Sequence, residues 1–481
     1  MGTYHVESRD GLIAVFDVGK TNKKFTLFSL DLRPLHTEST RIGEVWRGGL
    51  LCDDVEAIVA WVKSVLTRYA GKLSAVAITT YGATVALLDK EGGLVMPVVS
   101  YNHEIDPRIR EEFYEEFGPP EELYMRTGTP PLGQLLNVGV QLFWVSREYP
   151  GKYGRVRSML FLPQYLAFTL SGYKSLEVTS LGCHTYLYDM VERGWSSVAK
   201  GLDVPARAPP MHEVWEPLGE VSGAVITPGI HDSNASLLPY LLAEKGDFVL
   251  ASTGTWCVLM YPGAPFAPST SDMRRDILYY VDAFGRPVKA ARFKCGHEFD
   301  HYVSLIRRCF GVEPLEIGLD ERKAAEVIKS REIFVLPTLT PGTGQFPHSK
   351  GRVVGAFSRD AREAYYAVNL SLALQTWYAI TLLTGRSKLR LIVQGGFAKN
   401  DVYLAYLATL MPEAEVIKAS YPEATSLGAA ITALSALEGV EPRKLRLSLP
   451  QLGGERVAGL NVEEHLVQEY AEEFLRLCSE E

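Results

Sequence analysis

Hydrophobic and polar positions along the chain follow two patterns, one typical of buried strands and one typical of amphipathic helices. Uninterrupted apolar runs predict strands, as in LIAVFDV from Leu12 and LRLIVQG from Leu389. In DDVEAIVAWVKSVLTRYAG, from Asp53, acidic residues open a helical pattern and a glycine closes it. Such segments alternate along the whole chain, which predicts an α/β fold.

One strand-turn-strand element occurs twice in the sequence. A glycine-containing turn joins two apolar strands in LIAVFDVGKTNKKFTLFSLD, and the same design returns in DFVLASTGTWCVLMYPG. When Gly19 is placed on Gly254, Asp17 falls on Ser252, about half a chain away. A repeat at this distance predicts two related domains.

Length and composition agree with a two-domain protein. The 481 residues are too many for one hydrophobic core, and we expect an N-terminal domain of residues 1–244 and a C-terminal domain of residues 245–481. Hydrophobic residues make up 47% and charged residues 22%, and no apolar run is long enough to span a membrane. The polar first residues lack the layout of a secretion signal, so we expect a cytoplasmic protein with no membrane partner.

Charge and cysteine content exclude further classes of protein. The net charge of −8 is spread along the chain and the basic clusters are short, which argues against a nucleic-acid partner. The six cysteines form no CxxC pair, so we expect reduced core cysteines instead of disulfides or a zinc cluster. The sequence leaves the oligomeric state open, a homodimer being one option.

Gly19-Lys20-Thr21 spells the last three residues of a phosphate-binding P-loop. A P-loop also needs a glycine five positions earlier and a bare loop that wraps the phosphates. Ala14 occupies that earlier position, and the residues after it read as the end of a buried strand. A second strand, not a helix, follows Thr21, so the sequence argues against a P-loop.

The two glycine-containing turns predict a different kind of phosphate site. Turns at residues 19–22 and 253–255 can offer backbone N–H groups to a triphosphate from two sides. Either turn alone is better read as an ordinary hairpin, and only the duplication favours phosphate binding. Asp17 stands at the base of the first turn, where a carboxylate can hold Mg²⁺ directly or through water.

A second carboxylate, Asp232, stands in GAVITPGIHDSNASLLPYLLA between a short strand and a helix. Because Asp, Ser and Asn are common helix N-caps, a purely structural role is one reading of this residue. The other reading is a general base that accepts the proton of a substrate hydroxyl as it attacks a γ-phosphate.

Taken together, these segments resemble the FGGY carbohydrate kinases of the actin, Hsp70 and sugar kinase superfamily. FDVGKTNKK and STGTW resemble the two phosphate motifs, GIHDSNAS the catalytic-aspartate segment, and QGGFAKND with EATSLGAA the adenosine motif. TTYGATVALLDKEG and MPVVSYNHEID resemble the sugar-contact region. The order of the segments also matches. The resemblance implies two actin-like (ribonuclease H-like) domains, with mixed sheets flanked by helices and a cleft between them.

The resemblance also implies an ATP- and Mg²⁺-dependent kinase of a ketose or polyol. Asp232 would be the general base, and Asp17 a carboxylate associated with Mg²⁺. The residues that would contact ATP are Gly19, Lys20, Thr21, Asn22, Lys23, Gly254, Thr255, Gly395, Gly396 and Asn400. The residues that would contact the sugar are Tyr81, Gly82, Tyr101, Asn102, His103, His231 and Asp232.

Within the family, YGATVALLDKEG and FLPQYLAFTLSGYKSLEVTS look most like the rhamnulokinase and fuculokinase branch, which phosphorylates six-carbon deoxyketoses such as L-rhamnulose and L-fuculose. The chain departs from that branch in the sugar pocket. Ala83-Thr84 stands where the branch often has an Asp, and Asn102-His103 stands where it has an Arg-Asp pair. Xylulose, ribulose and glycerol-like acceptors therefore stay open.

Three alternatives also stay open. His231 either contacts the sugar or only packs beside Asp232. The segment RFKCGHEFDHY, from Arg292 to Tyr302, is either an element that closes over the substrates or a solvated helix start. The competing functions are a phosphohydrolase or ATPase, in which Asp232 activates water, and a non-catalytic sugar sensor.

Overall fold

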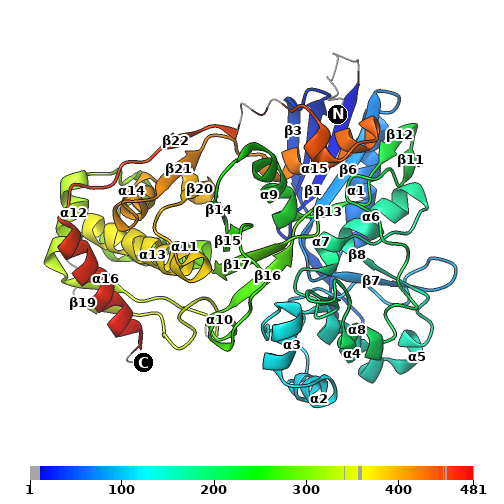
Figure 1. The fold of residues 1–481 in the computed structure, drawn as a ribbon, viewed down its shortest axis with the longest axis horizontal. Coiled ribbons are helices and arrows are strands. Elements are labelled where there is room, and N and C mark those ends of the chain that lie inside the picture. Colours follow the sequence, from blue (N-terminus) through cyan, green and yellow to red (C-terminus); the bar gives the residue numbers. More distant parts are fainter. Residues whose placement is uncertain (1–10, 341, 356–359, 448, 450–451, 480–481) are drawn as a thin grey trace. The chain divides into compact units, whose positions relative to one another are not determined.

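The computed structural model describes residues 11–340, 342–355, 360–447, 449 and 452–479. The chain divides into two compact units, each with its own sheet and helices (Figure 1). Unit 1 comprises Met1–Ala243, Tyr279–Pro287 and Glu423–Leu449. Unit 2 comprises Glu244–Leu278, Val288–Pro422 and Pro450–Glu481. The first border lies beside the expected boundary at 244/245, but two later segments return to unit 1, so one cut does not separate the units.

The sheet of unit 1 has the strand order β11-β12-β6-β1-β2-β3, with β13 also paired to β6. Its strands are β1 Leu12–Val18, β2 Asn22–Ser29, β3 Pro34–Arg41, β6 Leu73–Thr80, β11 Gly219–Val221, β12 Ala224–Ile226 and β13 Ile230–His231. β1 is antiparallel to β2 and parallel to β6, and β6 is parallel to β12 and β13. The carboxyl ends of β1, β6 and β13 therefore meet at one edge of the sheet.

A second sheet, formed almost entirely by unit 2, has the order β16-β17-β15-β14-β20-β21-β22, and the end of β16 falls in the Tyr279–Pro287 segment that is grouped with unit 1. Its strands are β14 Phe248–Thr253, β15 Cys257–Tyr261, β16 Ile277–Val281, β17 Pro287–Phe293, β20 Arg390–Gly395, β21 Glu415–Ala419 and β22 Gly454–Arg456. Read from β17 to β22, the pairs run antiparallel twice, parallel twice and antiparallel once, as they do from β3 to β11 in unit 1. This match confirms the predicted duplication and the mixed α/β fold.

Helices cover the two sheets and shorter strand pairs complete each unit. The helices of unit 1 are α1 Val55–Arg68, α2 Arg108–Phe117, α3 Pro120–Thr127, α4 Val138–Glu148, α5 Pro150–Tyr153, α6 Leu162–Ser171, α7 Val178–Leu181, α8 Ser197–Gly201, α9 Asp232–Ala243, α15 Ala424–Glu438 and η3 Pro442–Lys444. Those of unit 2 are α10 Thr270–Met273, α11 Cys295–Phe310, η1 Pro314–Glu316, α12 Glu321–Ser330, α13 Ala361–Thr384, η2 Gly396–Lys399, α14 Asp401–Leu410 and α16 Glu464–Ser479. The remaining strands are β4 Glu44–Arg47, β5 Leu50–Asp53, β7 Val85–Leu88, β8 Ser158–Phe161, β9 Tyr188–Asp189, β10 Gly194–Trp195, β18 Ile333–Val335 and β19 Val353–Gly355.

The two faces of β1 have different neighbours. Phe16 and Val18 belong to the hydrophobic cluster formed with α1, and the Phe16 ring meets Trp61 edge to face at 5.5 Å. Because side chains alternate along a strand, Asp17 points to the opposite face. Both α9 and α15 pack on this sheet, and α15 contacts β1, β6 and α9. Asp17 is thereby directed away from the α1 core.

Helix α15 lies in unit 1, although the sequence EATSLGAA was assigned to the adenosine motif of the second domain. A Cβ atom on Gly428 would lie 1.8 Å from the Ala235 carbonyl oxygen, so α15 and α9 approach backbone to backbone. Only a glycine permits this approach. The contacts therefore group α15 with unit 1, whereas QGGFAKND lies in unit 2, and the assignment of EATSLGAA to the adenosine motif stays a prediction.

The apolar face of the last helix, α16, is part of the core of unit 2. Tyr470 donates a hydrogen bond to the Ile333 carbonyl oxygen at 2.6 Å, and its ring stacks on Phe334 at 4.4 Å. Phe474 is also buried. Burial of each such side chain stabilises the fold by about 1.5–3 kcal/mol, so α16 helps to hold unit 2 together.

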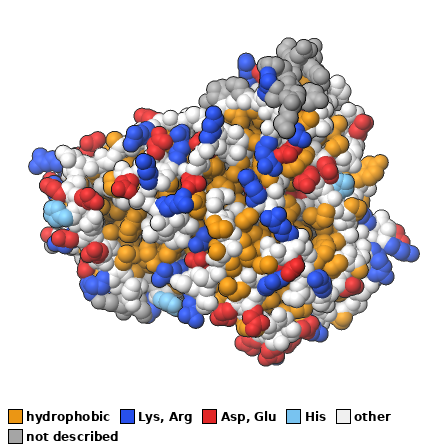
Figure 2. Space-filling view, in the orientation of Figure 1, with side chains coloured by type: hydrophobic (Ala, Val, Ile, Leu, Met, Phe, Trp, Pro, Cys, Tyr) orange, Lys and Arg blue, Asp and Glu red, His pale blue; other side chains and the backbone are white. Residues whose placement is uncertain are grey.

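Surface and cysteine properties agree with the composition. On the face shown in Figure 2, acidic and basic side chains are interspersed. Among the described residues, no helix combines the length and apolar character that crossing a membrane requires. None of the six cysteines forms a disulfide; Cys309 is exposed and the other five are buried, as expected of core cysteines.

Candidate functional site

Two carboxylates lie at neighbouring strand ends of unit 1. Asp17 of β1 is in register with Thr79 of β6, and Ile230 of β13 is in register with the same threonine. Asp232 comes two residues after Ile230 and is the first residue of α9. Since the three strands are parallel, Asp17 and Asp232 come to the same edge of the sheet. Both were predicted from the sequence, and the sheet register brings them together.

The surroundings of Asp17 disfavour its ionised form. Burial raises its pKa to about 7; Lys24 opposes the rise, while the carboxylates of Asp232 and Glu423 add to it. Lys24 stands opposite Asp17 in the β1–β2 register, and its Nζ lies 2.8 Å from Glu423 Oε2. Because Lys24 forms an ion pair with Glu423, its positive charge offsets only part of the negative charge around Asp17. A cation at this edge would favour the ionised carboxylate.

The donor set fits Mg²⁺ only as part of a complex with other ligands. In the described part of the chain, no group of three or more His, Cys, Asp or Glu side chains is arranged to hold a metal ion. Mg²⁺ usually keeps several waters and takes one or two carboxylates together with phosphate oxygens. Asp17 and Asp232 are two such carboxylates, and both have raised pKa values. The residues present therefore fit an ion that binds with a nucleotide.

Asp232 has the properties of a proton acceptor. Burial raises its pKa to about 6, although hydrogen bonds from Ser233 lower it, and 33% of its side chain is exposed. The Ser233 backbone N–H donates to Asp232 Oδ1 at 2.6 Å. A capping aspartate accepts from residues two or three positions further on, so this bond is not a capping bond. Asp232 is thus ionised at neutral pH and reachable by a substrate.

His231 is buried between Asp232 and the sugar-contact segment. Its Nε2 lies 3.3 Å from Asp232 Oδ1, and its Nδ1 lies 3.3 Å from the Asn234 amide nitrogen. Since that amide donates, Nδ1 accepts and Nε2 carries the proton. Burial lowers the pKa of His231 to about 4, so the ring is neutral. A Cβ atom on Gly82 would be 3.0 Å from Nε2, so the predicted Gly82 also lies here.

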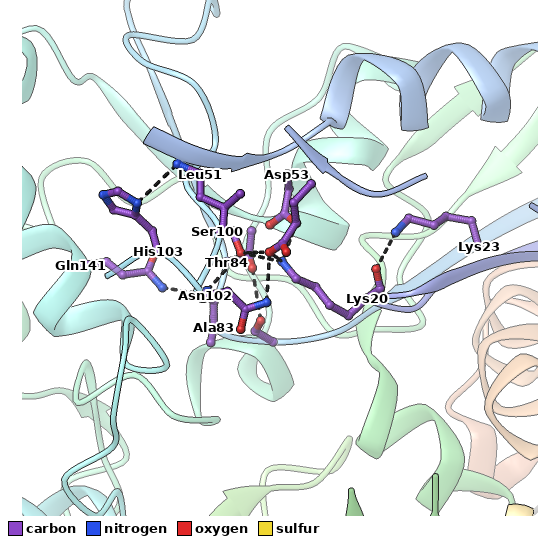
Figure 3. A network of polar contacts seen from close by, with 12 residues as sticks. Lys20, Lys23, Leu51, Asp53, Ala83, Thr84, Ser100, Asn102, His103 and Gln141 are labelled. Atoms are coloured by element: carbon purple, nitrogen blue, oxygen red, sulfur yellow. Dashed lines mark hydrogen bonds and ion pairs between the residues drawn. The ribbon is translucent and has the colours of Figure 1, made fainter. Parts of the chain in front are cut away.

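Lys20, predicted to contact phosphate, is bound by other side chains of unit 1. Its Nζ lies 2.6 Å from Asp53 Oδ1 and 2.8 Å from Ser100 Oγ (Figure 3). Glu44 Oε1 is 2.9 Å away. An ammonium group has three N–H donors, and these three partners use all of them. The network therefore argues against a phosphate contact for Lys20.

Two predicted sugar-contact tyrosines flank this lysine. The Lys20 Nζ lies 4.4 Å from the ring centroid of Tyr101 and 5.0 Å from that of Tyr81, within the range of cation–π attraction. The two rings meet edge to face at 5.9 Å. Burial and the neighbouring Asp53 carboxylate hold the pKa of Tyr81 well above its usual value, so its hydroxyl stays protonated. Lys20 therefore lies among residues that were predicted to contact the sugar.

Asn102 and His103 continue the same cluster. The Asn102 amide donates to Glu44 Oε1 at 3.0 Å. The Leu51 backbone N–H donates to His103 Nδ1 at 3.3 Å (Figure 3). Tyr101, Asn102 and His103 are all partly exposed. The structure thus places the predicted Tyr81, Tyr101, Asn102 and His103 in one region of unit 1.

Sequence reasoning missed Glu44 and Asp53. They lie directly opposite each other in the antiparallel β4–β5 pair. Two like charges in that position repel, unless a cation lies between them, and Lys20 supplies that cation. The acidic residues at the ends of this short hairpin are the only signal in the sequence, and it does not reveal the partner.

The other predicted residues of the first turn have separate positions. Thr21 and Asn22 are exposed at the turn, whereas Lys23 is buried opposite Val18. The Lys23 Nζ donates to the Lys20 carbonyl oxygen at 2.9 Å. Thr21 and Asn22 are accessible to a ligand, and the Lys23 side chain braces the turn.

Unit 2 contains a pocket of about 370 Å³ beside the second turn. Its lining includes the predicted Gly254, Thr255, Gly396 and Asn400, but not Gly395. The other lining residues are Gly296, Phe299, Asp300, Leu315, Tyr365, Phe397 and Lys399. The Phe299 and Phe397 rings meet edge to face at 5.2 Å. Aromatic walls and glycine backbones in a pocket of this size suit a flat base with attached phosphates.

Gly395 and Asn400 fix the course of the backbone beside this pocket. Gly395 has φ +87°, and a Cβ atom on it would lie 2.0 Å from the Thr253 carbonyl oxygen. Only glycine fits there. The Asn400 side chain accepts the Tyr403 N–H at 3.1 Å as the N-cap of α14, and it donates to Asn369 Oδ1 at 2.7 Å. These contacts fix where α14 begins.

Two cations that the sequence reasoning did not assign lie beside the second turn. The Arg292 guanidinium and the Lys294 ammonium lie 5.1 and 5.4 Å from the centroid of the Trp256 ring. The Gly296 N–H donates to the Thr255 carbonyl oxygen at 3.1 Å. The segment from Arg292 thus packs on the turn as the end of β17 and the start of α11.

The Arg292–Tyr302 segment contains the start of α11, and this helix start is half-buried. Cys295, Glu298 and Tyr302 are buried, whereas His297, Asp300 and His301 are exposed. Glu298 accepts the Thr338 N–H at 2.7 Å, which ties α11 to the chain beyond β18. A role for the segment in closure stays a prediction.

Comparison with known proteins gives matches over most of the chain. The N-terminal domain model of the FGGY family of carbohydrate kinases matches residues 12–226, and the FGGY carbohydrate kinase C-terminal domain model matches residues 245–442. A crystal structure of a carbohydrate kinase from Novosphingobium aromaticivorans superposes with a TM-score of 0.80 and 29% identity. That superposition covers 97% of this chain and 98% of the other.

Curated relatives match over shorter stretches. The chain is 28% identical over 261 residues to a rhamnulokinase from Halalkalibacterium halodurans, which is 50% of this chain and 52% of that protein. It is 26% identical over 203 residues to an L-fuculokinase from Escherichia coli K12, which is 39% of this chain and 42% of that protein. The chain thus spans about half the length of these curated relatives.

Proposed function

Since the chain belongs to the FGGY family of carbohydrate kinases, we propose that it transfers the γ-phosphoryl group of ATP to a hydroxyl of a ketose or polyol. One observation carries this proposal: Asp17 and Asp232 lie at one sheet edge with raised pKa values, and Asp232 is partly exposed. A base with a pKa of about 6 is ionised at neutral pH and can still hold a proton in the transition state.

Asp232 acts in this proposal as the general base. It accepts the proton of the acceptor hydroxyl while that oxygen forms a bond to the γ-phosphorus and the bond to the ADP oxygen breaks. The neutral His231 keeps its Nε2–H beside Asp232 Oδ1, which holds the carboxylate in place. A Mg²⁺ ion, held by Asp17 together with the nucleotide, would offset the negative charge of the phosphates.

The nucleotide is assigned to the pocket of unit 2. Gly254 and Thr255 offer backbone to the phosphates, and Gly396 and Asn400 border the adenosine beside the aromatic wall. On unit 1, the exposed Thr21 contacts the phosphates together with Gly19 and Asn22. We propose that residues 1–244 bind the acceptor and that residues 245–481 bind ATP. This functional division differs from the two contact units, because α15 belongs to unit 1.

The acceptor is assigned to the sugar-contact region of unit 1. A match to proteins named rhamnulokinase and L-fuculokinase supports a six-carbon deoxyketose such as L-rhamnulose or L-fuculose as the first candidate. Asn102 and His103 are neutral where that branch carries an Arg-Asp pair, and xylulose, ribulose and glycerol are therefore tested alongside. Sugar contacts are proposed for Tyr81, Gly82, Tyr101, Asn102, His103 and His231.

A coupled assay with ATP, Mg²⁺ and a panel of these five acceptors tests the proposal. Asp232→Asn should lower kcat by about 10²- to 10⁴-fold because the proton acceptor is lost, while ATP binding measured by calorimetry is retained. Wild-type kcat should also fall as the pH drops below about 6, because Asp232 becomes protonated.

The control is Asp203→Asn, which neutralises an aspartate with 67% of its side chain exposed and should leave kcat unchanged. Phosphate release at full rate without any acceptor would favour a phosphohydrolase. ATP binding without transfer to any acceptor would favour a sugar sensor and overturn the proposal.

A further inference from the structure

The two oxygens of the Glu44 carboxylate have different surroundings. Oε1 accepts hydrogen bonds from Ser100 Oγ and, at 3.0 Å, from the Asn102 amide, and it lies 2.9 Å from the Lys20 Nζ. All three of these contacts are made to Oε1 and none of them to Oε2. The side chain is 27% exposed. The three partners thus orient the carboxylate through Oε1. Oε2 can accept a hydrogen bond from a ligand.

This carboxylate belongs to the same unit as the proposed base, and contacts connect the two. Gly82 touches His231, which lies beside Asp232. The preceding residue, Tyr81, donates its N–H to the Val18 carbonyl oxygen at 3.4 Å, next to the first turn. Lys20 then packs over Tyr81 and pairs with Glu44. A chain of contacts within unit 1 therefore links Glu44 to the proposed base.

The neighbours of Glu44 suit a carbohydrate. Trp46 lies two residues further along β4, on the same face of the strand, and 70% of it is exposed. Its ring is 6.3 Å from the ring of His103. An aromatic face for C–H groups beside polar groups for hydroxyls matches the amphipathic surface of a sugar.

We propose that Glu44 binds a hydroxyl group of the acceptor sugar through Oε2, and that Lys20 is a positioning residue that holds Glu44 instead of a ligand of the ATP phosphates. This inference rests on the proposed kinase function and assigns to it a specificity-determining residue. The sequence motif places Lys20 with phosphate, whereas its three side-chain partners place it with the sugar.

Charge decides which chemical class of acceptor fits. Burial would raise the pKa of Glu44, but the hydrogen bonds from Ser100 and Lys20 outweigh it and hold the pKa below its usual value. An ionised carboxylate only accepts hydrogen bonds, so it selects an O–H donor and repels an anion. Lys20 is already matched by Asp53 and cannot compensate an acidic acceptor. The site thus favours a neutral ketose or polyol over a sugar acid.

The decisive variant is Glu44→Gln in the full chain, which keeps the Oε1 acceptor and replaces the ionised Oε2 by an amide donor. The KM of the acceptor should rise about 10- to 100-fold, because a hydrogen bond to a charged group is lost. The KM of ATP should not change, and calorimetric binding of the sugar without ATP should weaken by the same factor. Glu38→Gln, in the exposed pair with Arg68, is the charge-matched control and should change neither constant.

Acceptor analogues that each lack one hydroxyl identify the group that Glu44 binds. The analogue without that hydroxyl should lose a similar factor with the wild-type enzyme and little more with Glu44→Gln, because both changes remove one contact. Equal losses for the two enzymes with every analogue would contradict the assignment of Glu44.

Lys20→Met separates the two roles of the lysine. A positioning role predicts a higher acceptor KM with the ATP KM unchanged. A higher ATP KM with the acceptor KM unchanged would overturn it, as would an active Glu44→Gln enzyme with a normal acceptor KM. If the wild-type chain phosphorylates no acceptor, the proposed function fails by itself, and calorimetric sugar binding by Glu44→Gln still decides the role of Glu44.

Discussion

The turn after β1 and the turn after β14 occupy the same place in two similar sheets but have different charged neighbours. Asp17 is in register with Thr79 of β6, and Ser252 has the same relation to Gln394 of β20. Five carboxylates lie near the first turn; Lys20 pairs with Glu44 and Asp53, Lys24 pairs with Glu423, and Asp17 and Asp232 are the other two. Near the second turn lie the cations Lys294 and Arg292, of which Arg292 pairs with Asp276, and Asp300 lines the adjoining pocket.

The backbone of the next strand differs in the same way. Thr80 ends β6 opposite Val18, whereas the equivalent position in β20, opposite Thr253, is Gly395. Duplication therefore supplied equivalent positions, and later residue choice separated their chemistry. Carboxylates suit a proton acceptor and a cation on unit 1, and cations with bare backbone suit a nucleotide on unit 2.

The largest effect is expected from removing the carboxylate of Asp17, and a much smaller one from changing Ser252 at the equivalent strand position. Asp17→Asn should lower kcat by about 10²- to 10³-fold, because the carboxylate proposed for Mg²⁺ is lost. Ser252→Ala, its counterpart, should change kcat by no more than a few-fold. Steady-state rates over a Mg²⁺ titration measure both. Equal losses would show that the two turns do not differ as their charges indicate.

Gly395→Ala should destabilise unit 2 by about 3 kcal/mol or more, because the new Cβ clashes with the Thr253 carbonyl and φ is positive. Gly385 also has a positive φ, +59°, but open space around it. Gly385→Ala is thus the matched control, with an expected loss of about 1 kcal/mol. Urea denaturation of both variants checks the difference, and similar losses would mean that the close approach at Gly395 is unimportant.

The carboxylates of unit 1 should make stability depend on pH. The pKa of Asp17 rises from 3.8 unfolded to about 7 folded, so between these values the folded state binds more protons. The unfolding free energy therefore falls as pH rises through this interval. Asp17→Asn removes this term and should gain up to about 4 kcal/mol over the wild type between pH 4 and pH 8. Urea denaturation at both pH values measures it, and a gain independent of pH would contradict the burial of this charge.

The cations of unit 2 should give the smallest effect. Lys294→Met should raise the KM of ATP about 3- to 10-fold, because one positive charge near the second turn is lost. The KM of the acceptor should stay the same, and the effect should shrink at high salt. This is the opposite of the pattern expected for Lys20→Met. A change in acceptor KM alone would place Lys294 with the sugar.

Much of the fold could be predicted from local patterns in the sequence. The apolar runs that become β1, β14 and β20 are readable because strand formation depends on consecutive residues. The acidic opening of α1 is readable for the same reason: Asp54 accepts the Ala57 N–H at 3.2 Å as its N-cap. The repeat of strand, glycine turn and strand then predicted the two similar sheets.

Site residues at strand ends were also predictable. Asp17 and Asp232 stand out because a carboxylate directly after an apolar strand needs a partner. The roles assigned to them, and to the residues of the adenosine pocket, stay predictions. Sequence order could not show that Asp17 faces Lys24 and not Lys23, since that depends on the register of β1 with β2.

The sequence by itself determined the α/β class, the duplication and the positions of the two aspartates. Each of these can be recognised from short stretches of consecutive residues. Only the tertiary structure decided that Lys20 pairs with residues 33 and 80 positions away, and that α15 returns to unit 1, where Glu423 meets Lys24. The physical reason is that the partners of a side chain depend on which groups lie near it in the folded chain and on how deeply they are buried, and not on their distance along the sequence. Gly19-Lys20-Thr21 spells a phosphate motif, and the carboxylates of β4 and β5 hold its lysine instead.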